Sequence, residues 1–357
     1  MVQATLQACL IGAGSFGAHA LAALRDLPAV ELVGLSDRDT QVASSAAAQA
    51  GCPAYSDHRR VVVETNPEVV FLAVPPAPAA ELVRLAARRG IHVWRQVPCA
   101  RNLHEAIDLC RSMDRAGRKF AIGTQRRFMR AYQQARAMLP RLGQAYLVRA
   151  EYQFNLGPEL GWRGDRSAGG GALLELGYHI FDLLVWLWGL PESVYALTGT
   201  GQRARGGEDL PVYDSDDTAA TVLRFGGGLA AVVTVSRCFG PLAEAVRIHG
   251  QGGLLEVGPE ECVLRDRDGN VVERLADGET PAEVFGRMID AFARAAKQDA
   301  ARYECSGWES LRTQAVVEAA YLSDQTGQPE DPADLLAGYD VSESDCLRYA
   351  PARRSSS

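Results

Sequence analysis

The spacing of apolar residues predicts alternating strands and helices over the first third of the chain. Short apolar runs rich in β-branched side chains, the pattern of buried strands, occupy residues 6–11, 30–35, 69–74, 91–94 and 119–123. Apolar side chains recur at helical spacing over residues 18–27, 77–89 and 102–117, and Asn102 is a suitable N-cap for the last of these. Strands that alternate with helices favour a doubly wound parallel sheet of the α/β class, covered on both faces.

The pattern changes after about residue 124. A helix is expected at residues 128–139, followed by longer strand-like runs at 144–154, 219–225, 229–236 and 245–249. A turn of three glycines at 226–228 separates two of these runs, which favours an antiparallel sheet within an α+β domain. For 357 residues we expect two domains, 1–124 and 125–330, and a C-terminal extension, 331–357, whose last residues (351–357) are disordered.

The turn between the first strand and the first helix carries a glycine motif, Gly-Ala-Gly-Ser-Phe-Gly at residues 12–17. Gly12 permits a tight turn, Gly14 leaves room for a pyrophosphate, and Gly17 lets the helix pack against the strand. The free amides at the start of the helix attract phosphate. Asp37 follows the second strand, 20 residues after Gly17, where a ribose 2′-hydroxyl requires an acceptor. The sequence therefore predicts a dinucleotide site.

The identity of the dinucleotide depends on Asp37 and Arg38. A carboxylate at position 37 repels a 2′-phosphate and favours NAD, whereas Arg38 can pair with that phosphate if Asp37 turns aside, so NADP stays possible. Ligands of parallel sheets lie beyond the carboxyl ends of the strands, which adds the turns at residues 74–76 and 96–98. The residues expected to bind the coenzyme are Gly12, Gly14, Ser15, Phe16, Gly17, Asp37, Arg38, Val74, Pro75, Gln96 and Pro98.

Composition excludes several classes of partner. A formal net charge of −7, with dispersed basic residues, argues against a nucleic-acid-binding protein. The N-terminus has no export signal, so we expect a cytoplasmic protein with no membrane partner. The eight cysteines lack the spacing of a zinc site, and the acidic segment 201–217 is interpreted as a solvated loop; no metal is expected.

Residues 173–188 are apolar on nearly all sides, which indicates a helix buried over most of its surface. Only Glu175, His179 and Asp182 ionise in it at ordinary pH, and their i, i+4, i+7 spacing predicts that they share one face. Charged groups on a buried helix are costly unless they are paired or presented to a cleft. Two interpretations stay open: a structural set of polar side chains, or an acid/base site.

In the acid/base interpretation, His179 exchanges the proton that accompanies hydride transfer, and Glu175 orients its ring and stabilises the imidazolium. Asp182 lies on the same predicted face, toward the substrate. Trp162 can stack on a sugar ring, although a single Trp more often serves packing. Arg127, like Arg126 and Arg163, can bind a carboxylate or phosphate, or remain a surface charge.

Together these motifs resemble the glucose-fructose oxidoreductase, inositol dehydrogenase and MocA (Gfo/Idh/MocA) family over about residues 6–327. The resemblance is carried by the glycine turn with Asp37 and by residues 90–98, 126–128, 169–182, 217–219 and 309–323. It implies a Rossmann domain joined to a domain with a large open, mainly antiparallel sheet that supports homo-oligomers, dimers or tetramers. It also implies hydride exchange between NAD(P) and a sugar, polyol or related carbonyl or imine substrate.

One departure from the family pattern concerns the substrate side. Family members usually have Glu-Lys-Pro where this chain has Gln96-Val97-Pro98, and the lysine normally contacts substrate beside the nicotinamide. Val97 lines that position but can neither donate a side-chain hydrogen bond nor carry charge. Glu175 also replaces the usual Asp, and the histidine often found after the turn at Pro75 is absent.

These departures leave two main hypotheses and a remote third. The chain is an active oxidoreductase with an atypical site centred on His179, or a catalytically silent NAD(P)-binding sensor or regulatory protein of the same fold. The third hypothesis, the least favoured, is a hydrolase that uses NAD transiently.

Overall fold

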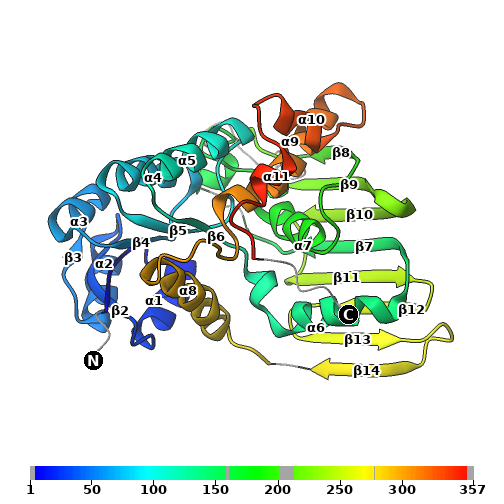
Figure 1. The fold of residues 1–357 in the computed structure, drawn as a ribbon, viewed down its shortest axis with the longest axis horizontal. Helices are drawn as coiled ribbons and strands as arrows, with labels where there is room; N and C mark the ends of the chain where they lie inside the picture. Colours follow the sequence, from blue (N-terminus) through cyan, green and yellow to red (C-terminus); the bar gives the residue numbers. More distant parts are fainter. Residues whose placement is uncertain (1–4, 158–160, 201–212, 277, 352–357) are drawn as a thin grey trace.

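The structure, a computed structural model, describes residues 5–157, 161–200, 213–276 and 278–351 (Figure 1). A parallel sheet and a mainly antiparallel sheet lie side by side in it. The predicted disorder of the chain end and most of the acidic segment 201–217 concern residues outside those described. Among the described helices, none is long and apolar enough to cross a membrane.

The first sheet has six parallel strands in the order β3-β2-β1-β4-β5-β6, which confirms the doubly wound α/β prediction. Its strands are β1 (Leu6–Ile11), β2 (Val30–Ser36), β3 (Ala54–Tyr55), β4 (Val69–Leu72), β5 (His92–Gln96) and β6 (Phe120–Gly123). The connecting helices are α1 (Ser15–Arg25), α2 (Thr40–Ala50), α3 (His58–Thr65), α4 (Pro76–Arg89) and α5 (Leu103–Arg115). The strand order reverses between β1 and β4, the switch point at which such sheets bind nucleotides.

Side-chain caps begin three of these helices. Asp39, Asp57 and Asn102 accept hydrogen bonds from backbone amides of α2, α3 and α5, respectively. The cap at Asn102 confirms the prediction. Helices α2 and α3 and the two-residue strand β3 were not predicted. The buried face of α2 consists of alanines and has no stripe of large apolar side chains.

The second sheet has eight strands in the order β14-β13-β12-β11-β7-β10-β9-β8, and only the β7–β10 pair is parallel. Its strands are β7 (Ala145–Gln153), β8 (Ser193–Gly199), β9 (Thr218–Phe225), β10 (Leu229–Ser236), β11 (Ala243–Gly250), β12 (Gly253–Val257), β13 (Glu261–Arg265) and β14 (Val271–Ala276). The three glycines at 226–228, now η5, join β9 and β10 as an antiparallel pair, as predicted.

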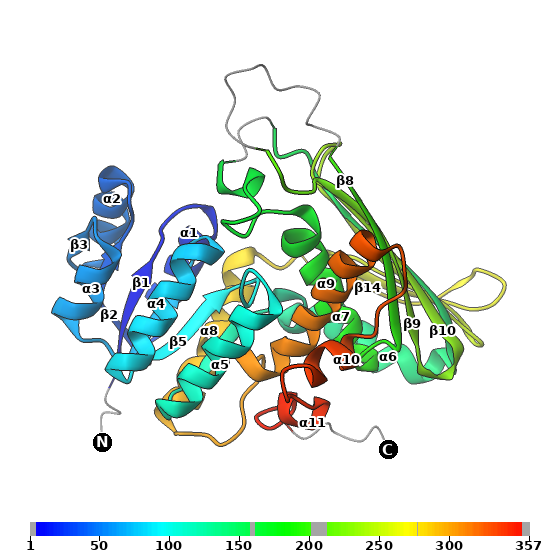
Figure 2. The ribbon, with the colours of Figure 1, turned by 90° about the horizontal axis from the view of Figure 1, so that it is seen from above.

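Helices cover one face of the second sheet. They are α6 (Arg130–Leu142), the π-helix η3 (Leu173–Gly177), α7 (Tyr178–Trp188) and α9 (Gly307–Thr326), and they lie between this sheet and the first domain (Figure 2). No described helix packs on the opposite face. Tyr195, Val222 and Val232 are partners across β8, β9 and β10 there, and all three are exposed.

Helix α8 (Pro281–Lys297) returns to the first domain although its sequence lies within the expected second one. It packs beside α1 and buries Phe285 and Phe292 against Trp94 and Phe71 of the parallel sheet. The chain therefore crosses between the two sheets more than once. The remaining short elements are η1 (Gln125–Phe128), η2 (Gly161–Gly164), α10 (Pro332–Ala337) and α11 (Glu343–Cys346).

Candidate functional site

The glycine turn has the geometry that its spacing predicts. Gly12 has a positive φ of 89°, and a Cβ there would overlap the carbonyl oxygen of Ala73. A Cβ on Gly17 would overlap the carbonyl oxygen of Gly12, because helix and strand approach closely. Gly14 has no atom within 4 Å of its Cβ position, so the outer side of the turn is open. This combination fits a pyrophosphate laid on the turn.

The carboxylate of Asp37 is fixed beside this turn. Its Oδ2 accepts a hydrogen bond from the amide of Ala13 at 2.8 Å, and its Oδ1 accepts one from the amide of Asp39 at 2.9 Å. Each carboxylate oxygen can accept a further bond, so both stay available to ribose hydroxyls. Ser15 and Phe16 are exposed at the start of α1.

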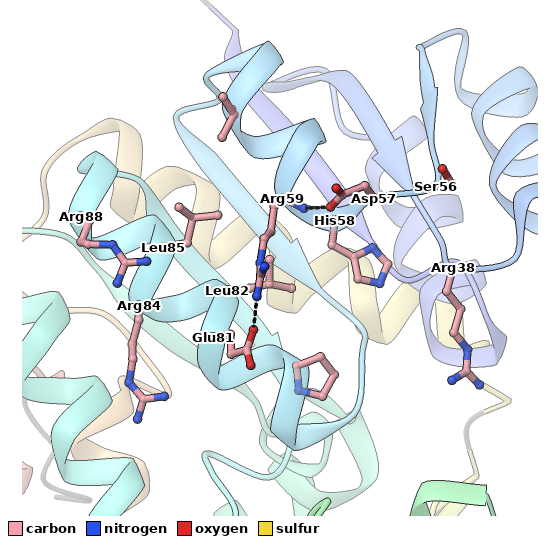
Figure 3. Close-up of a pocket in the computed structure, with 12 residues that line it drawn as sticks. Arg38, Ser56, Asp57, His58, Arg59, Glu81, Leu82, Arg84, Leu85 and Arg88 are labelled. Carbon is pink, nitrogen blue, oxygen red and sulfur yellow. Dashed lines mark hydrogen bonds and ion pairs between the residues drawn. The ribbon is translucent and has the colours of Figure 1, made fainter.

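A cavity of about 790 Å³ lies beside the end of β2, between α3 and α4 (Figure 3). Four arginines and two acids are among its lining residues. Arg59 forms an ion pair with Glu81 at 2.6 Å, while Arg38 lies at the opposite side of the cavity from Arg88. His58 shares a 3.0 Å hydrogen bond with Ser36, the last residue of β2. The cavity thus adjoins the end of the strand that precedes Asp37, the acid predicted to bind the ribose.

The turns after β4 and β5 lie at the same edge of the sheet. Val74 and Pro75 are half-buried after β4. Gln96 ends β5 with a buried side chain, and neither its Oε1 nor its Nε2 has a hydrogen-bond partner among the described residues. Buried polar atoms are usually paired, so this amide fits a position that a coenzyme completes. Val97 follows half-buried, and Pro98 is buried.

The three ionisable residues of the buried helix do not act as one face. Residues 173–177 form a π-helix, whose wider turn rotates Glu175 away from a simple i, i+4 relation with His179. Glu175 Oε1 accepts a 2.7 Å hydrogen bond from Arg163 Nε. No described hydrogen bond joins Glu175 to His179. The prediction that Glu175 orients the imidazole is therefore not supported.

His179 is 6% exposed and lies edge-on to the ring of Tyr152, with centroids 5.9 Å apart. The guanidinium of Arg126 lies 4.9 Å from the centre of the same tyrosine ring and forms an ion pair with Glu244. Burial, with a smaller contribution from Arg126, lowers the pKa of His179 well below its ordinary value. The imidazole is therefore neutral at physiological pH and able to accept a proton.

Arg127 and Asp182, both predicted to contact substrate, form a buried ion pair with each other. Arg127 donates from Nε and Nη2 to the two carboxylate oxygens of Asp182, at 2.8 and 2.7 Å. Glu309 accepts from the remaining terminal nitrogen, and Thr313 donates to Asp182 at 3.2 Å. Both residues are paired within the protein, which argues against the predicted substrate contact. The hydrogen bonds among Arg127, Asp182 and Glu309 connect η1, α7 and α9.

Trp162 lies on η2, partly exposed, with the guanidinium of Arg163 4.8 Å from its ring centre. Arg163 thus contacts both Trp162 and Glu175. Two further residues at the site, Tyr152 and Arg237, escaped the sequence analysis. Side chains alternate between the two faces of a strand, so Tyr152 lies on the same face of β7 as the buried Val148 and Ala150. This alternation could have predicted that Tyr152 points into the protein.

No group of three or more His, Cys, Asp or Glu side chains is placed to hold a metal ion in the part of the chain that the structure describes.

Comparison with known proteins identifies both domains. Residues 6–124 match the model of the oxidoreductase family with an NAD-binding Rossmann fold, and residues 132–256 match the GFO/IDH/MocA C-terminal domain. D-xylose 1-dehydrogenase (NADP(+)) 2 of Haloferax volcanii is 26% identical over 88% of this chain and 97% of its own. Inositol 2-dehydrogenase 4 of Saccharopolyspora erythraea is 26% identical over 93% and 96%, respectively.

The fold is likewise similar to that of solved structures. A levoglucosan dehydrogenase in complex with NADH and levoglucosan superposes with a TM-score of 0.81 and 21% identity, over 92% of this chain and 99% of that one. The two family models follow one another along the chain and cover its parallel sheet and most of its second sheet. The protein belongs to the GFO/IDH/MocA family of oxidoreductases, and its first domain is an NAD-binding Rossmann domain.

Proposed function

We propose that the protein transfers a hydride between NAD(P) and a sugar, polyol or related carbonyl or imine substrate, with His179 as the acid/base. The observation that carries the proposal is a neutral, buried imidazole on the second-domain helix of a chain whose first domain has an intact dinucleotide turn. Relatives named as D-xylose and inositol dehydrogenases support the substrate class.

The chain's own residues hold the coenzyme in this proposal. The amides at the start of α1 and the open side of Gly14 take the pyrophosphate, and Asp37 accepts from the ribose hydroxyls. The carboxylate of Asp37 favours NAD, and Arg38 leaves NADP possible. Gln96 completes its hydrogen bonds on the nicotinamide side. When bound, the oxidised coenzyme supplies the hydride acceptor.

His179 moves the proton. In the oxidative direction the substrate hydroxyl gives its proton to the neutral imidazole as its carbon loses a hydride, so a carbonyl forms. A lowered pKa suits an imidazole that must be unprotonated before the reaction. In the reductive direction the imidazolium returns the proton to the new alkoxide. Tyr152 keeps the ring in place by edge-on contact.

Val97 favours a second candidate. Without the lysine usual in the family, the turn at residues 96–98 provides no charged donor to a substrate. A catalytically silent NAD(P)-binding sensor or regulatory protein needs only the coenzyme-binding features of the first domain, which are all present. The two candidates differ in one measurable property, since only the enzyme changes the redox state of bound coenzyme.

A panel assay tests the proposal. Purified protein with NAD or NADP is incubated with D-xylose, D-glucose or myo-inositol. In the reductive direction it is incubated with NADH or NADPH and a sugar lactone or cyclic imine. Absorbance of the reduced nicotinamide is followed in both directions. We expect turnover of at least one neutral polyhydroxylated substrate. Tight coenzyme binding without turnover of any substrate would support the sensor instead.

The open face of the second sheet supports a further part of the proposal, a homo-oligomer. Leu197 and Val222 are 57% and 49% exposed there, and apolar patches of this kind favour burial against another copy. We expect a dimer or tetramer by light scattering, and a monomer for Val222→Lys. Val63→Lys, on the exposed side of α3, is the control and should keep the oligomer; a monomeric wild type contradicts the idea.

A further inference from the structure

Arg237 is a buried arginine with incomplete hydrogen bonds. It directly follows β10, its side chain has 0% exposure, and Nη2 donates to Ser215 Oγ at 2.7 Å. Its Nε and Nη1 have no hydrogen-bond partner among the described residues. The ring of Tyr213 lies 5.9 Å from the guanidinium carbon, and its hydroxyl interacts electrostatically with Arg237, but Nε and Nη1 make no described hydrogen bond. Because buried donors are nearly always paired, the two free nitrogens indicate a missing acceptor.

Glu175, by contrast, has a hydrogen-bond acceptor that lacks a donor. Its Oε1 is bound by Arg163, but its Oε2 is buried without a partner among the described residues. Arg237 Nη1 lies 4.0 Å from this oxygen. That separation is longer than a hydrogen bond, so the two charges attract while a donor on one and an acceptor on the other stay free.

A hydroxyl group can pair with both the free donor of Arg237 and the free acceptor of Glu175. It accepts one hydrogen bond through a lone pair and donates another through its proton, so a single hydroxyl can satisfy both Arg237 and Glu175. A carboxylate or phosphate would satisfy only the arginine and would face repulsion from Glu175. The donor–acceptor arrangement therefore selects a neutral polyhydroxylated ligand over an anionic one.

We propose that Arg237 and Glu175 bracket one hydroxyl group of the substrate, which makes Arg237 a substrate-binding residue that determines specificity. The inference rests on the proposed function, since the bracketed hydroxyl belongs to the sugar or polyol that His179 deprotonates elsewhere on the molecule. β10 packs beside η3, and Glu175 in η3 precedes His179 by four residues, so the bracket joins the end of β10 to the helical segment directly before the acid/base. Arg237 also provides the substrate side with a charged donor, which Val97 cannot.

Deoxy analogues test the bracket without disturbing the protein. D-xylose, D-glucose and myo-inositol are titrated calorimetrically into wild-type protein saturated with NADH. If D-glucose binds, its 2-, 3-, 4- and 6-deoxy analogues follow; otherwise the monodeoxy series of the sugar or polyol that does bind is used. We expect one analogue to bind about 10-fold or more weakly than its parent, because it leaves both buried groups unpaired.

The same titrations on Arg237→Met assign that loss to the bracket. The variant should bind the parent sugar about 10-fold more weakly, and the sensitive analogue should then lose less than about two-fold relative to the parent, because the two changes remove one interaction. Arg237→Lys keeps the charge but loses the planar guanidinium, so its affinity for the parent sugar should lie between those of the wild type and Arg237→Met. The exposed Arg274→Met on β14 is the control and should match the wild type.

The outcomes separate this inference from the proposed function. A deoxy penalty of equal size in wild type and Arg237→Met overturns the bracket, even if turnover continues. Binding of sugars with the predicted coupling but without hydride transfer overturns the proposed function and keeps the bracket. Failure of all three parent compounds to bind overturns the bracket, while the assay with lactones and cyclic imines still decides the proposed function. If Arg237→Met does not fold, Arg237→Lys and the deoxy series on wild type decide the matter.

Discussion

The coenzyme half and the substrate half of the site differ in how far a local motif determines their geometry. In the first domain, Gly12, Gly17 and Asp37 occupy the positions that spacing alone predicts, because a positive φ and a close helix–strand approach are properties of a few neighbouring residues. In the second, Glu175, His179 and Asp182 share a helix but have separate partners from distant segments.

This difference shows that a charged residue on a buried helix cannot be assigned a role from its helix alone. Asp182 is satisfied by Arg127, 55 residues away, whereas Glu175 keeps one oxygen free. The unpaired group carries the stronger functional argument, since a fully paired ion in the interior has nothing left to offer a ligand.

Removing His179 should have the largest effect on the substrate half. His179→Ala is expected to lower kcat about 10³-fold, because the general base contributes on the order of 10²–10⁴ in rate. The dissociation constant of NADH, measured by tryptophan fluorescence, should stay within a few fold of the wild type. Unchanged turnover would remove His179 from the chemistry and turn attention to Tyr152.

Breaking the Arg127–Asp182 pair should destabilise the fold. Arg127→Met leaves Asp182 as a buried carboxylate without its cation and leaves Glu309 with Arg312 alone, which costs about 3–5 kcal/mol in the free energy of unfolding. Urea unfolding measures the loss, and Arg274→Met on the exposed edge strand should change stability by less than about 0.5 kcal/mol. A stable Arg127→Met protein with only a raised KM would restore Arg127 as a substrate contact.

Two glycines give a matched test of the coenzyme half. Gly12→Ala forces a Cβ into the Ala73 carbonyl at a positive φ, so NADH binding should weaken about 100-fold or the domain should lose stability, by about 1–3 kcal/mol. Gly14→Ala adds its methyl to open space at a φ of −64°, so the melting temperature should not change. Its NADH affinity should still fall, because the methyl occupies the pyrophosphate position. Equal behaviour of both variants would contradict the assigned roles.

The titration of His179 should produce the smallest effect. Its pKa is lower in the folded protein than in the unfolded chain, so the stability it contributes is complete above about pH 6.5 and is lost as the pH falls below that value. The loss is at most about 1.4 kcal/mol per pH unit, and His179→Asn should reduce the acid sensitivity of urea unfolding between about pH 6.5 and 5. An identical pH dependence in the variant would mean that the imidazole is not buried neutral.

The sequence by itself determined most strands and helices of the first domain, although not α2, β3 and α3, together with the glycine turn, Asp37 and the cap at Asn102. Each is set by backbone conformation or by contacts within a few residues, and these leave a local pattern. The sequence also predicted that the second domain is rich in strands, although it did not predict β8, β12, β13, β14 or the π-helix η3.

Only the tertiary structure decided the partners. The pairing of Asp182 with Arg127, the contact of His179 with Tyr152, and the gap between Glu175 and Arg237 join side chains that the chain brings together from different elements. The return of α8 to the first domain is of the same kind. Burial and charge compensation depend on such long-range neighbours, and residue spacing along one helix contains no information about them.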